Sequence, residues 1–255
     1  MNIFCDKSGF GLNFRLVNGI MLIDAEADGV SGQFAFDTGA MQTVIDPKYF
    51  PDKSGEDAEV ARFSDGVKET GVKLGVLERV SFGGLAVTDL PTVIMDMSYV
   101  ETPLKGFMPE LKLLGTLGID VLGRFSIFLD YAAEKITLDS PRPDGFVSIP
   151  LDFDILPTVM ISGHRFVLDT GANTCLLASD VIADFDPQDG GQPGLYTIPK
   201  MELSGFAYEN ILAVVADMTA IRQKVPADGV IGYQILSKQR SYLDFKAGEL
   251  LLEKV

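Results

Sequence analysis

The chain of 255 residues has no tryptophan, two cysteines (Cys5 and Cys175) and one histidine (His164). No Cys-x-x-Cys pair occurs, so the composition argues against a metal site built from cysteine and histidine. A histidine-based catalytic triad would have to use His164, which lies in the segment Ser162–Arg165. We expect this segment to be an exposed turn and the two cysteines to remain unbonded, so neither type of site is predicted.

The sequence also lacks the roughly 18 consecutive apolar residues that a membrane-spanning helix needs. Residues 1–11 contain no basic segment followed by an apolar stretch, so no secretory signal is visible. We expect a soluble protein, cytoplasmic as the sequence stands, and periplasmic or secreted if a signal has been removed. Positive charge is scarce: 21 Lys and Arg face 36 Asp and Glu, and the net charge of −15 disfavours nucleic acid as a partner.

What the chain does contain is apolar residues in short runs. Hydrophobic residues make up 47% of the sequence, with 26 glycines and 13 prolines between the runs. Val, Ile and Phe are frequent in those runs, and this mixture is typical of many short strands joined by turns. The composition therefore predicts an all-β protein.

An internal repeat organises these strands. The segment Phe34–Ala40 (FAFDTGA) recurs as Phe166–Ala172 (FVLDTGA), at an offset of 169 − 37 = 132 residues. Two further blocks repeat in the same order, at offsets of 198 − 77 = 121 and 232 − 118 = 114: Leu77–Ser98 with Ile198–Thr219, and Thr116–Leu122 with Val230–Leu236. Three ordered blocks indicate a duplicated fold.

The shrinking offset locates an insertion in the first copy. The first half has 132 − 121 = 11 more residues between its first two blocks, around 56–75. There, Val60–Phe63 and Val67–Thr70 flank Ser64-Asp65-Gly66, and Asp-Gly between strand-like runs predicts a hairpin. The proline- and glycine-rich segment Ser140–Gly145 predicts a linker between residues 1–144 and 145–255. We also expect a turn-rich loop at Glu101–Pro103.

The repeated Asp-Thr-Gly is chemically unusual. In both copies an apolar strand runs directly into an aspartate, and burying a carboxylate costs free energy unless it is hydrogen-bonded or shares its charge. The following glycine allows a tight turn that brings backbone amides to the carboxylate. One such motif is more simply explained as a strand end. Two copies at equivalent places of a duplicated fold put two carboxylates beside a pseudo-two-fold axis.

These motifs resemble those of aspartic peptidases of the pepsin and retropepsin group. The matching features are Asp37-Thr38-Gly39-Ala40 and Asp169-Thr170-Gly171-Ala172, each followed by a hydrophobic-hydrophobic-Gly element that ends at Gly118 or Gly232. The resemblance implies a bilobal fold of two closed barrels with pseudo-two-fold symmetry, formed by a single chain. It also implies that the terminal segments Met1–Cys5 and Leu250–Val255 pair in a sheet beneath the lobes.

The resemblance further implies the roles of the residues. Asp37 and Asp169 are the expected catalytic pair, supported by the Thr, Gly and Ala residues that follow each of them. The extra hairpin is the expected flap, with Phe63, Ser64, Asp65 and Gly66 contacting an extended peptide substrate. No metal or cofactor is expected, and the protein is expected to act as a monomer, because both halves of the site lie in one chain.

Ala40 and Ala172 stand where pepsin has a hydroxyl residue. Loss of a donor to the carboxylate favours its protonated form, so we expect activity at less acidic pH than pepsin shows.

Two other functions compete with this interpretation. A catalytically inactive relative that binds peptides or acts as a scaffold would keep the same fold. An all-β structural or adhesion domain, such as a sandwich, would also contain many short strands, but it does not explain the repeated Asp-Thr-Gly-Ala.

Overall fold

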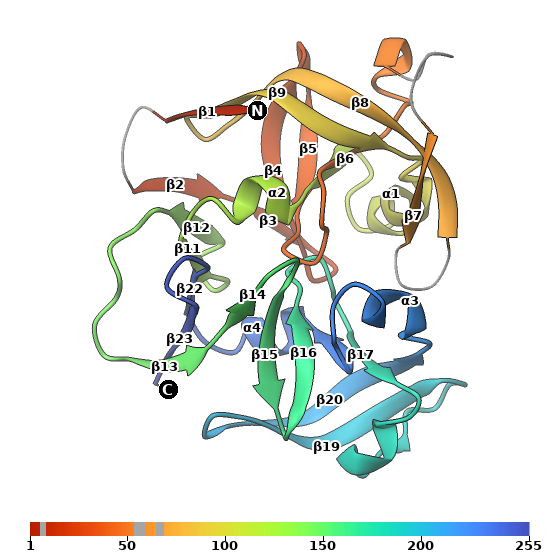
Figure 1. Cartoon of the computed structure of the whole chain (residues 1–255), viewed down its shortest axis with the longest axis vertical. Coiled ribbons are helices and arrows are strands. Elements are labelled where there is room, and N and C mark those ends of the chain that lie inside the picture. The colour runs from red at the N-terminus through yellow and green to blue at the C-terminus, as the bar shows by residue number, and fades with distance from the viewer. Residues whose placement is uncertain (6–8, 54–59, 65–68, 255) are drawn as a thin grey trace.

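A computed structural model describes residues 1–5, 9–53, 60–64 and 69–254 of the chain. Its strands form two lobes that lie one above the other, with a further sheet along one side (Figure 1). The first 117 residues supply most of the upper lobe, and residues 152–236 supply most of the lower one. The predicted all-β, bilobal fold is confirmed.

The sheet of the first lobe contains nine strands. Six of them form a closed ring in the order β9-β6-β10-β5-β4-β8, because β8 pairs with both β4 and β9. The strands are β1 (Asn2–Cys5), β3 (Arg15–Val17), β4 (Ile20–Ala27), β5 (Val30–Phe36), β6 (Val44–Ile45), β7 (Val60–Ser64), β8 (Glu69–Phe82), β9 (Leu85–Ile94) and β10 (Leu113–Leu117).

The sheet of the second lobe contains eight strands in the order β14-β15-β16-β21-β17-β20-β19-β18. Its two sides meet where the amide of Ser162 donates to the carbonyl of Glu202 at 2.9 Å. The strands are β14 (Asp152–Phe153), β15 (Pro157–Ile161), β16 (His164–Leu168), β17 (Cys175–Ala178), β18 (Gln188–Asp189), β19 (Leu195–Leu203), β20 (Phe206–Ala216) and β21 (Gly229–Ile231).

The two lobes repeat one topology. In the first, β5 runs parallel to β10 and β6 parallel to β9; in the second, β16 runs parallel to β21 and β17 parallel to β20. In each lobe an antiparallel pair, β6–β10 or β17–β21, links the two parallel pairs. The sequence repeat is thus a structural repeat.

A six-stranded sheet joins the lobes in the order β13-β23-β22-β11-β12-β2. At its centre β11 pairs with β22, so that Phe128 lies opposite Tyr242. These two residues are also equivalent in the internal repeat, since 242 − 128 = 114. Equivalent strands that pair with each other place the pseudo-two-fold axis between them. The strands are β2 (Phe10–Asn13), β11 (Ile127–Asp130), β12 (Lys135–Leu138), β13 (Phe146–Pro150), β22 (Ser241–Asp244) and β23 (Glu249–Glu253).

Helices are short and lie between the strands. They are α1 (Ser98–Lys105), α2 (Ile119–Leu122), α3 (Thr219–Arg222) and α4 (Tyr233–Leu236), with 3₁₀ turns at Pro51–Lys53 and Ile182–Phe185. The prediction of a turn-rich loop at Glu101–Pro103 is wrong, because these residues lie inside α1. The buried carboxylate of Glu101 accepts from Tyr49 at 2.6 Å and pairs with Lys105 at 3.0 Å, which stabilises the helix despite its proline.

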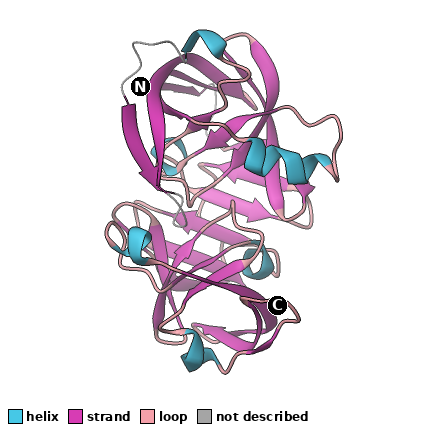
Figure 2. Cartoon of the chain, turned by 90° about the vertical axis from the view of Figure 1, so that its right-hand side faces the viewer, coloured by secondary structure: helices cyan, strands magenta, loops and turns pink. Residues whose placement is uncertain are grey.

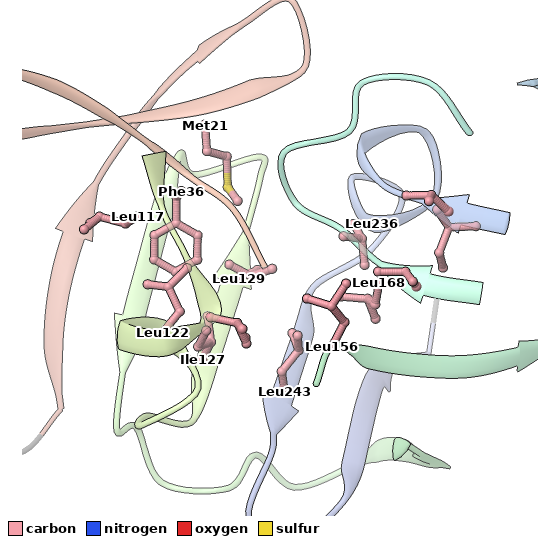
Figure 3. Packing of buried hydrophobic residues seen from close by; sticks show 14 of the residues in the cluster. Met21, Phe36, Leu117, Leu122, Ile127, Leu129, Leu156, Leu168, Leu236 and Leu243 are labelled. Carbon is pink, nitrogen blue, oxygen red and sulfur yellow. The ribbon is translucent and has the colours of Figure 1, made fainter. Parts of the chain in front are cut away.

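The strands form because their apolar residues alternate with exposed ones. In β11, for example, Ile127 and Leu129 are fully buried, while their neighbours are half-buried. One continuous cluster of buried side chains reaches from Phe36 in the first lobe to Leu168 and Leu243 (Figure 3). Burying each of these large side chains contributes about 2 kcal/mol. The strands that end at the Asp-Thr-Gly motifs are therefore firmly held in the core.

The terminal segments are arranged differently from the prediction. β1 pairs with β9 in the first lobe, whereas β23 pairs with β22 and β13 in the sheet between the lobes. The two ends of the chain lie apart in both views (Figures 1 and 2). The predicted pairing of Met1–Cys5 with Leu250–Val255 is therefore wrong. In the sheet between the lobes, the strand beside β12 is β2, not β1.

The inserted hairpin forms as a pair of strands, with Val60 opposite Lys73 and Ser64 opposite Glu69. The second lobe has only a short counterpart, in which the two residues of β18 pair with β19. The boundary between residues 144 and 145 falls in the segment between β12 and β13 and stays a prediction.

Candidate active site

Each Asp-Thr-Gly motif follows a strand whose last side chain is fully buried. The amide of Asp37 donates to the carbonyl of Leu117 at 3.1 Å, and the amide of Asp169 donates to that of Ile231 at 2.9 Å. A parallel neighbouring strand, β10 or β21, thus fixes the point where each chain turns. The two halves present their aspartates from matching positions.

The threonines of the two motifs bind each other's backbone. Thr38 N donates to Thr170 Oγ1 at 3.1 Å, and Thr170 N donates to Thr38 Oγ1 at 3.1 Å. Each hydroxyl donates in turn to a carbonyl of the opposite half at 2.7 Å: Thr38 Oγ1 to Leu168 O, and Thr170 Oγ1 to Phe36 O. Both threonines are completely buried. These four hydrogen bonds cross the pseudo-two-fold axis and hold the two turns together.

We expect Thr38→Val to destabilise the protein by about 2–4 kcal/mol, because it leaves a buried amide and a buried carbonyl without partners. Thr38→Ser keeps the hydroxyl and should cost less than half as much. Urea unfolding of both variants measures the difference. Equal stability of the valine and serine variants would show that the crossed hydrogen bonds do not hold the lobes together.

The structure brings the two predicted catalytic carboxyls into direct contact. Asp37 and Asp169 are joined by a side-chain hydrogen bond. Each motif glycine lies against the carboxyl of the other half: a Cβ atom at Gly39 would overlap that of Asp169, and one at Gly171 would overlap that of Asp37. Only glycine leaves room for both acids at these positions.

Burial raises the pKa of both carboxyls. For Asp169 the pKa lies well above the ordinary value, because the charge of Asp37 adds to the effect of burial. The pKa of Asp37 is also raised by burial, but its Oδ1 accepts amide hydrogen bonds from Gly39 at 2.8 Å and Ala40 at 3.0 Å. Asp169 Oδ1 accepts one from Gly171 at 2.7 Å. The pair therefore retains one proton that the two carboxyls share.

No basic side chain neutralises this pair: within the described residues, neither Asp37 nor Asp169 forms an ion pair with lysine, arginine or histidine. Among the described residues, their negative charge is balanced by backbone amides and by the shared proton. Such a pair can polarise a water molecule and exchange a proton with a bound group.

The carboxyls line a cleft with a cavity volume of about 180 Å³. Its walls are mainly apolar and come from both halves of the chain. One wall contains Met41, Met95, Met97 and Tyr99, and the other contains Leu156, Leu176, Ile221 and Val225. An apolar cleft with a few polar groups at its base is typical of a site that binds an extended organic ligand.

The two elements that end at Gly118 and Gly232 stabilise the Asp-Thr-Gly loops through backbone hydrogen bonds. The amide of Ile119 donates to Ala40 O at 2.8 Å, and the amide of Tyr233 donates to Ala172 O at 2.9 Å. A Cβ atom at either preceding glycine would collide with backbone of the Asp-Thr-Gly loop, which explains why glycine occurs there. Ala40 and Ala172 thus take part through their backbone.

The flap residues are only partly placed. Phe63 lies opposite Thr70 and Ser64 opposite Glu69 in the strand pairing, whereas Asp65 and Gly66 lie outside the described residues. Their contact with a substrate stays a prediction.

Two other expectations concern His164 and Cys175. His164 begins β16 rather than lying in an exposed turn; it is half-buried, with Nε2 at 3.2 Å from Asp184 Oδ2. The prediction was wrong because the turn ends one residue earlier, at Gly163. Cys175 is a buried free thiol whose pKa is raised to about 12 by burial. Its side chain faces the amide of Gly232 and has no reactive environment.

The sequence did not reveal a polar pair behind the first motif. Thr43 Oγ1 donates to Asp120 Oδ1 at 2.9 Å and accepts from the amide of Gly118 at 3.2 Å. In the second lobe the equivalent of Thr43 is Cys175, since 175 − 43 = 132. The pair is therefore specific to one lobe. An aspartate two residues after the glycine was the only available signal.

Comparison with known proteins supports the same assignment. Residues 23–121, which include the first Asp-Thr-Gly motif, match a family described as aspartyl protease. This part of the chain is similar to aspartyl proteases, and the predicted resemblance to the retropepsin-like peptidases is confirmed. The family supports a peptidase kind of activity and a peptide as the substrate. No curated protein matches the chain.

Two kinds of feature are absent from the described residues. No helix among them has the length and apolar character needed to cross a bilayer. No group of three or more His, Cys, Asp or Glu side chains among them lies together in a way that could hold a metal ion.

Proposed function

We propose that this protein is an aspartic endopeptidase in which Asp37 and Asp169 activate one water molecule for attack on a peptide bond. The observation that carries the proposal is the hydrogen-bonded pair of carboxyls at the base of a cleft, with raised pKa values and no ion-pair partner among the described residues. One chain supplies both aspartates, so the proposed active unit is a monomer, with lobes at 1–144 and 145–255.

The chemistry uses the single proton of the pair. Asp37, the ionised member, accepts a proton from water as the water oxygen bonds to the scissile carbonyl carbon. Asp169, the protonated member, donates a hydrogen bond to the carbonyl oxygen and stabilises the tetrahedral intermediate. The proton taken up by Asp37 then passes to the amide nitrogen, the C–N bond breaks, and a carboxylic acid and an amine leave. No covalent intermediate forms.

The substrate is proposed to lie extended in the cleft. Its backbone would add to the β7–β8 hairpin as a further strand, and its apolar side chains would fill the walls of the cleft. Closure of the hairpin over the peptide would exclude bulk water and strengthen the electrostatic effect of the carboxyls.

Digestion of an unstructured protein tests the proposal. Wild-type protein should cut it at mapped internal sites, and a peptide inhibitor that mimics the transition state, such as pepstatin, should stop the cleavage. If the wild type and an Asp37→Asn variant cleave the substrate equally poorly while the inhibitor still binds, the protein is an inactive peptide-binding relative instead.

The pH dependence follows from the raised pKa of Asp169. A raised pKa keeps the shared proton bound at higher pH, so kcat/KM should persist above the usual carboxyl range of about pH 4 and fall once this proton is lost. Ala172→Ser restores a hydroxyl donor near the carboxylate, lowers its pKa and should move the alkaline limb to lower pH. A wild-type profile that peaks well below about pH 4 contradicts the prediction.

A further inference from the structure

The two walls of the cleft differ in charge. The first-lobe wall is formed by uncharged side chains, with three methionines and Tyr99. The second-lobe wall contains one cationic side chain, Lys224, which lies just after α3 and is exposed. The chain has a net charge of −15, so its surface potential is mainly negative. A lysine at the edge of the cleft adds a local positive charge to that surface.

The position has no cationic counterpart in the other lobe. At the offset of 121 that relates the start of α1 to the start of α3, Lys224 corresponds to Pro103, since 224 − 121 = 103. The pseudo-two-fold symmetry of the cleft is therefore broken by charge at this point. A peptide bound across the axis would meet an apolar wall on one side and a positive charge on the other.

The arginines near Lys224 already have ion-pair partners. Arg165 pairs with Asp152, and Arg222 lies at 2.7 Å from Asp180 and 2.8 Å from Asp228. Among the residues that the structure describes, no carboxylate lies within the 4.0 Å ion-pair distance of Lys224 Nζ.

The backbone around Lys224 is nevertheless ordered by hydrogen bonds, since its amide donates to Ile221 O at 2.9 Å. An exposed lysine on a fixed turn that lines the cleft is available to a carboxylate of the ligand.

We propose that Lys224 determines specificity, and that the cleft selects peptides with an acidic side chain on the second-lobe side of the scissile bond. This inference rests on the proposed peptidase function and adds a substrate class to it. The ammonium group attracts the carboxylate of glutamate or aspartate, while the methionine-rich wall accepts an apolar side chain across the axis. Methionine side chains adapt to different apolar shapes. We therefore expect the selection of an acidic side chain by Lys224 to be stricter than the selection of an apolar side chain by the methionine-rich wall.

Cleavage of a peptide library with blocked termini tests the inference, because only side chains then carry carboxylates. Wild-type protein should prefer glutamate to glutamine at one position near the cut by roughly threefold to tenfold in kcat/KM. Lys224→Met should reduce this ratio to about one, Lys224→Glu should reverse it in favour of lysine, and Lys224→Arg should retain it. Lys246→Glu makes the same charge change at an exposed turn between β22 and β23 and should leave the ratio unchanged.

The outcomes separate the two claims. If wild-type protein cuts no peptide, the proposed function fails. If wild-type protein cuts peptides but shows no acidic preference, or if Lys224→Met and Lys224→Glu keep the wild-type preference, only the role of Lys224 is overturned. Cleavage of a neutral reference peptide by all variants shows that they are folded and active.

Discussion

Asp37→Asn and Asp169→Asn are each expected to lower kcat/KM for peptide cleavage by about a thousandfold or more. An asparagine cannot accept the proton of the attacking water or donate the shared proton of the pair, and general acid–base catalysis contributes roughly 10²–10⁴ to such rates. Because the two carboxyls act as one unit, the double variant should be little worse than either single variant.

The fold should survive these substitutions. Each asparagine removes one of two repelling, buried acids, so the thermal midpoint should not fall. Asp130→Asn is a matched control, because Asp130 is the last residue of β11 and lies outside the motifs. Its carboxylate accepts from the amide of Ala133 at 2.9 Å, as that of Asp244 does from Ala247 at 2.8 Å. This variant should keep near-normal activity. Undiminished cleavage by either motif variant would remove that aspartate from the mechanism.

Gly39→Ala is expected to lower activity by about a hundredfold, because a misplacement of about 1 Å at a reacting group has an effect of this size. The added methyl group would overlap the carboxyl of Asp169 and force it away from Asp37. Gly171→Ala should do the same to Asp37 from the other side. The symmetrical loss from two distant positions in the sequence is a consequence of the duplicated fold.

The glycine prediction has its own control. Gly106 lies exposed at the end of α1 with φ −63°, and a Cβ atom there would meet only the carbonyl of Pro103 at 3.2 Å. Gly106→Ala should therefore leave kcat/KM within about twofold of the wild type, in line with the small effects of most surface substitutions. If Gly39→Ala is as active as Gly106→Ala, the contact between the two motifs is not needed for the reaction.

The central features of this protein could be predicted from sequence because they are repeated. Two apolar strands running into Asp-Thr-Gly, and equivalent glycines behind them, are local patterns with a direct structural meaning. The structure adds the crossed threonine bonds, which the sequence could suggest but not measure.

The errors arise where tertiary contacts override a local signal. Pro103 suggested a loop, yet the buried Glu101 holds that segment in α1 through an ion pair with Lys48 from outside the helix and another with Lys105 within it. The N-terminal strand β1 pairs with β9 rather than with the C-terminal strand. The local sequence of a strand does not specify which sheet edge it joins. Lys224 was missed for a similar reason, since a single lysine after a short helix has no sequence signature.

Calorimetric titration with a hydroxyl-containing transition-state mimic is the most direct test of the account. One inhibitor should bind per chain, and either Asp37→Asn or Asp169→Asn should weaken binding by about a hundredfold or more, within the range by which such mimics exceed substrates. One inhibitor per two chains, or equal affinity of both variants and the wild type, would contradict a single site made by these two acids.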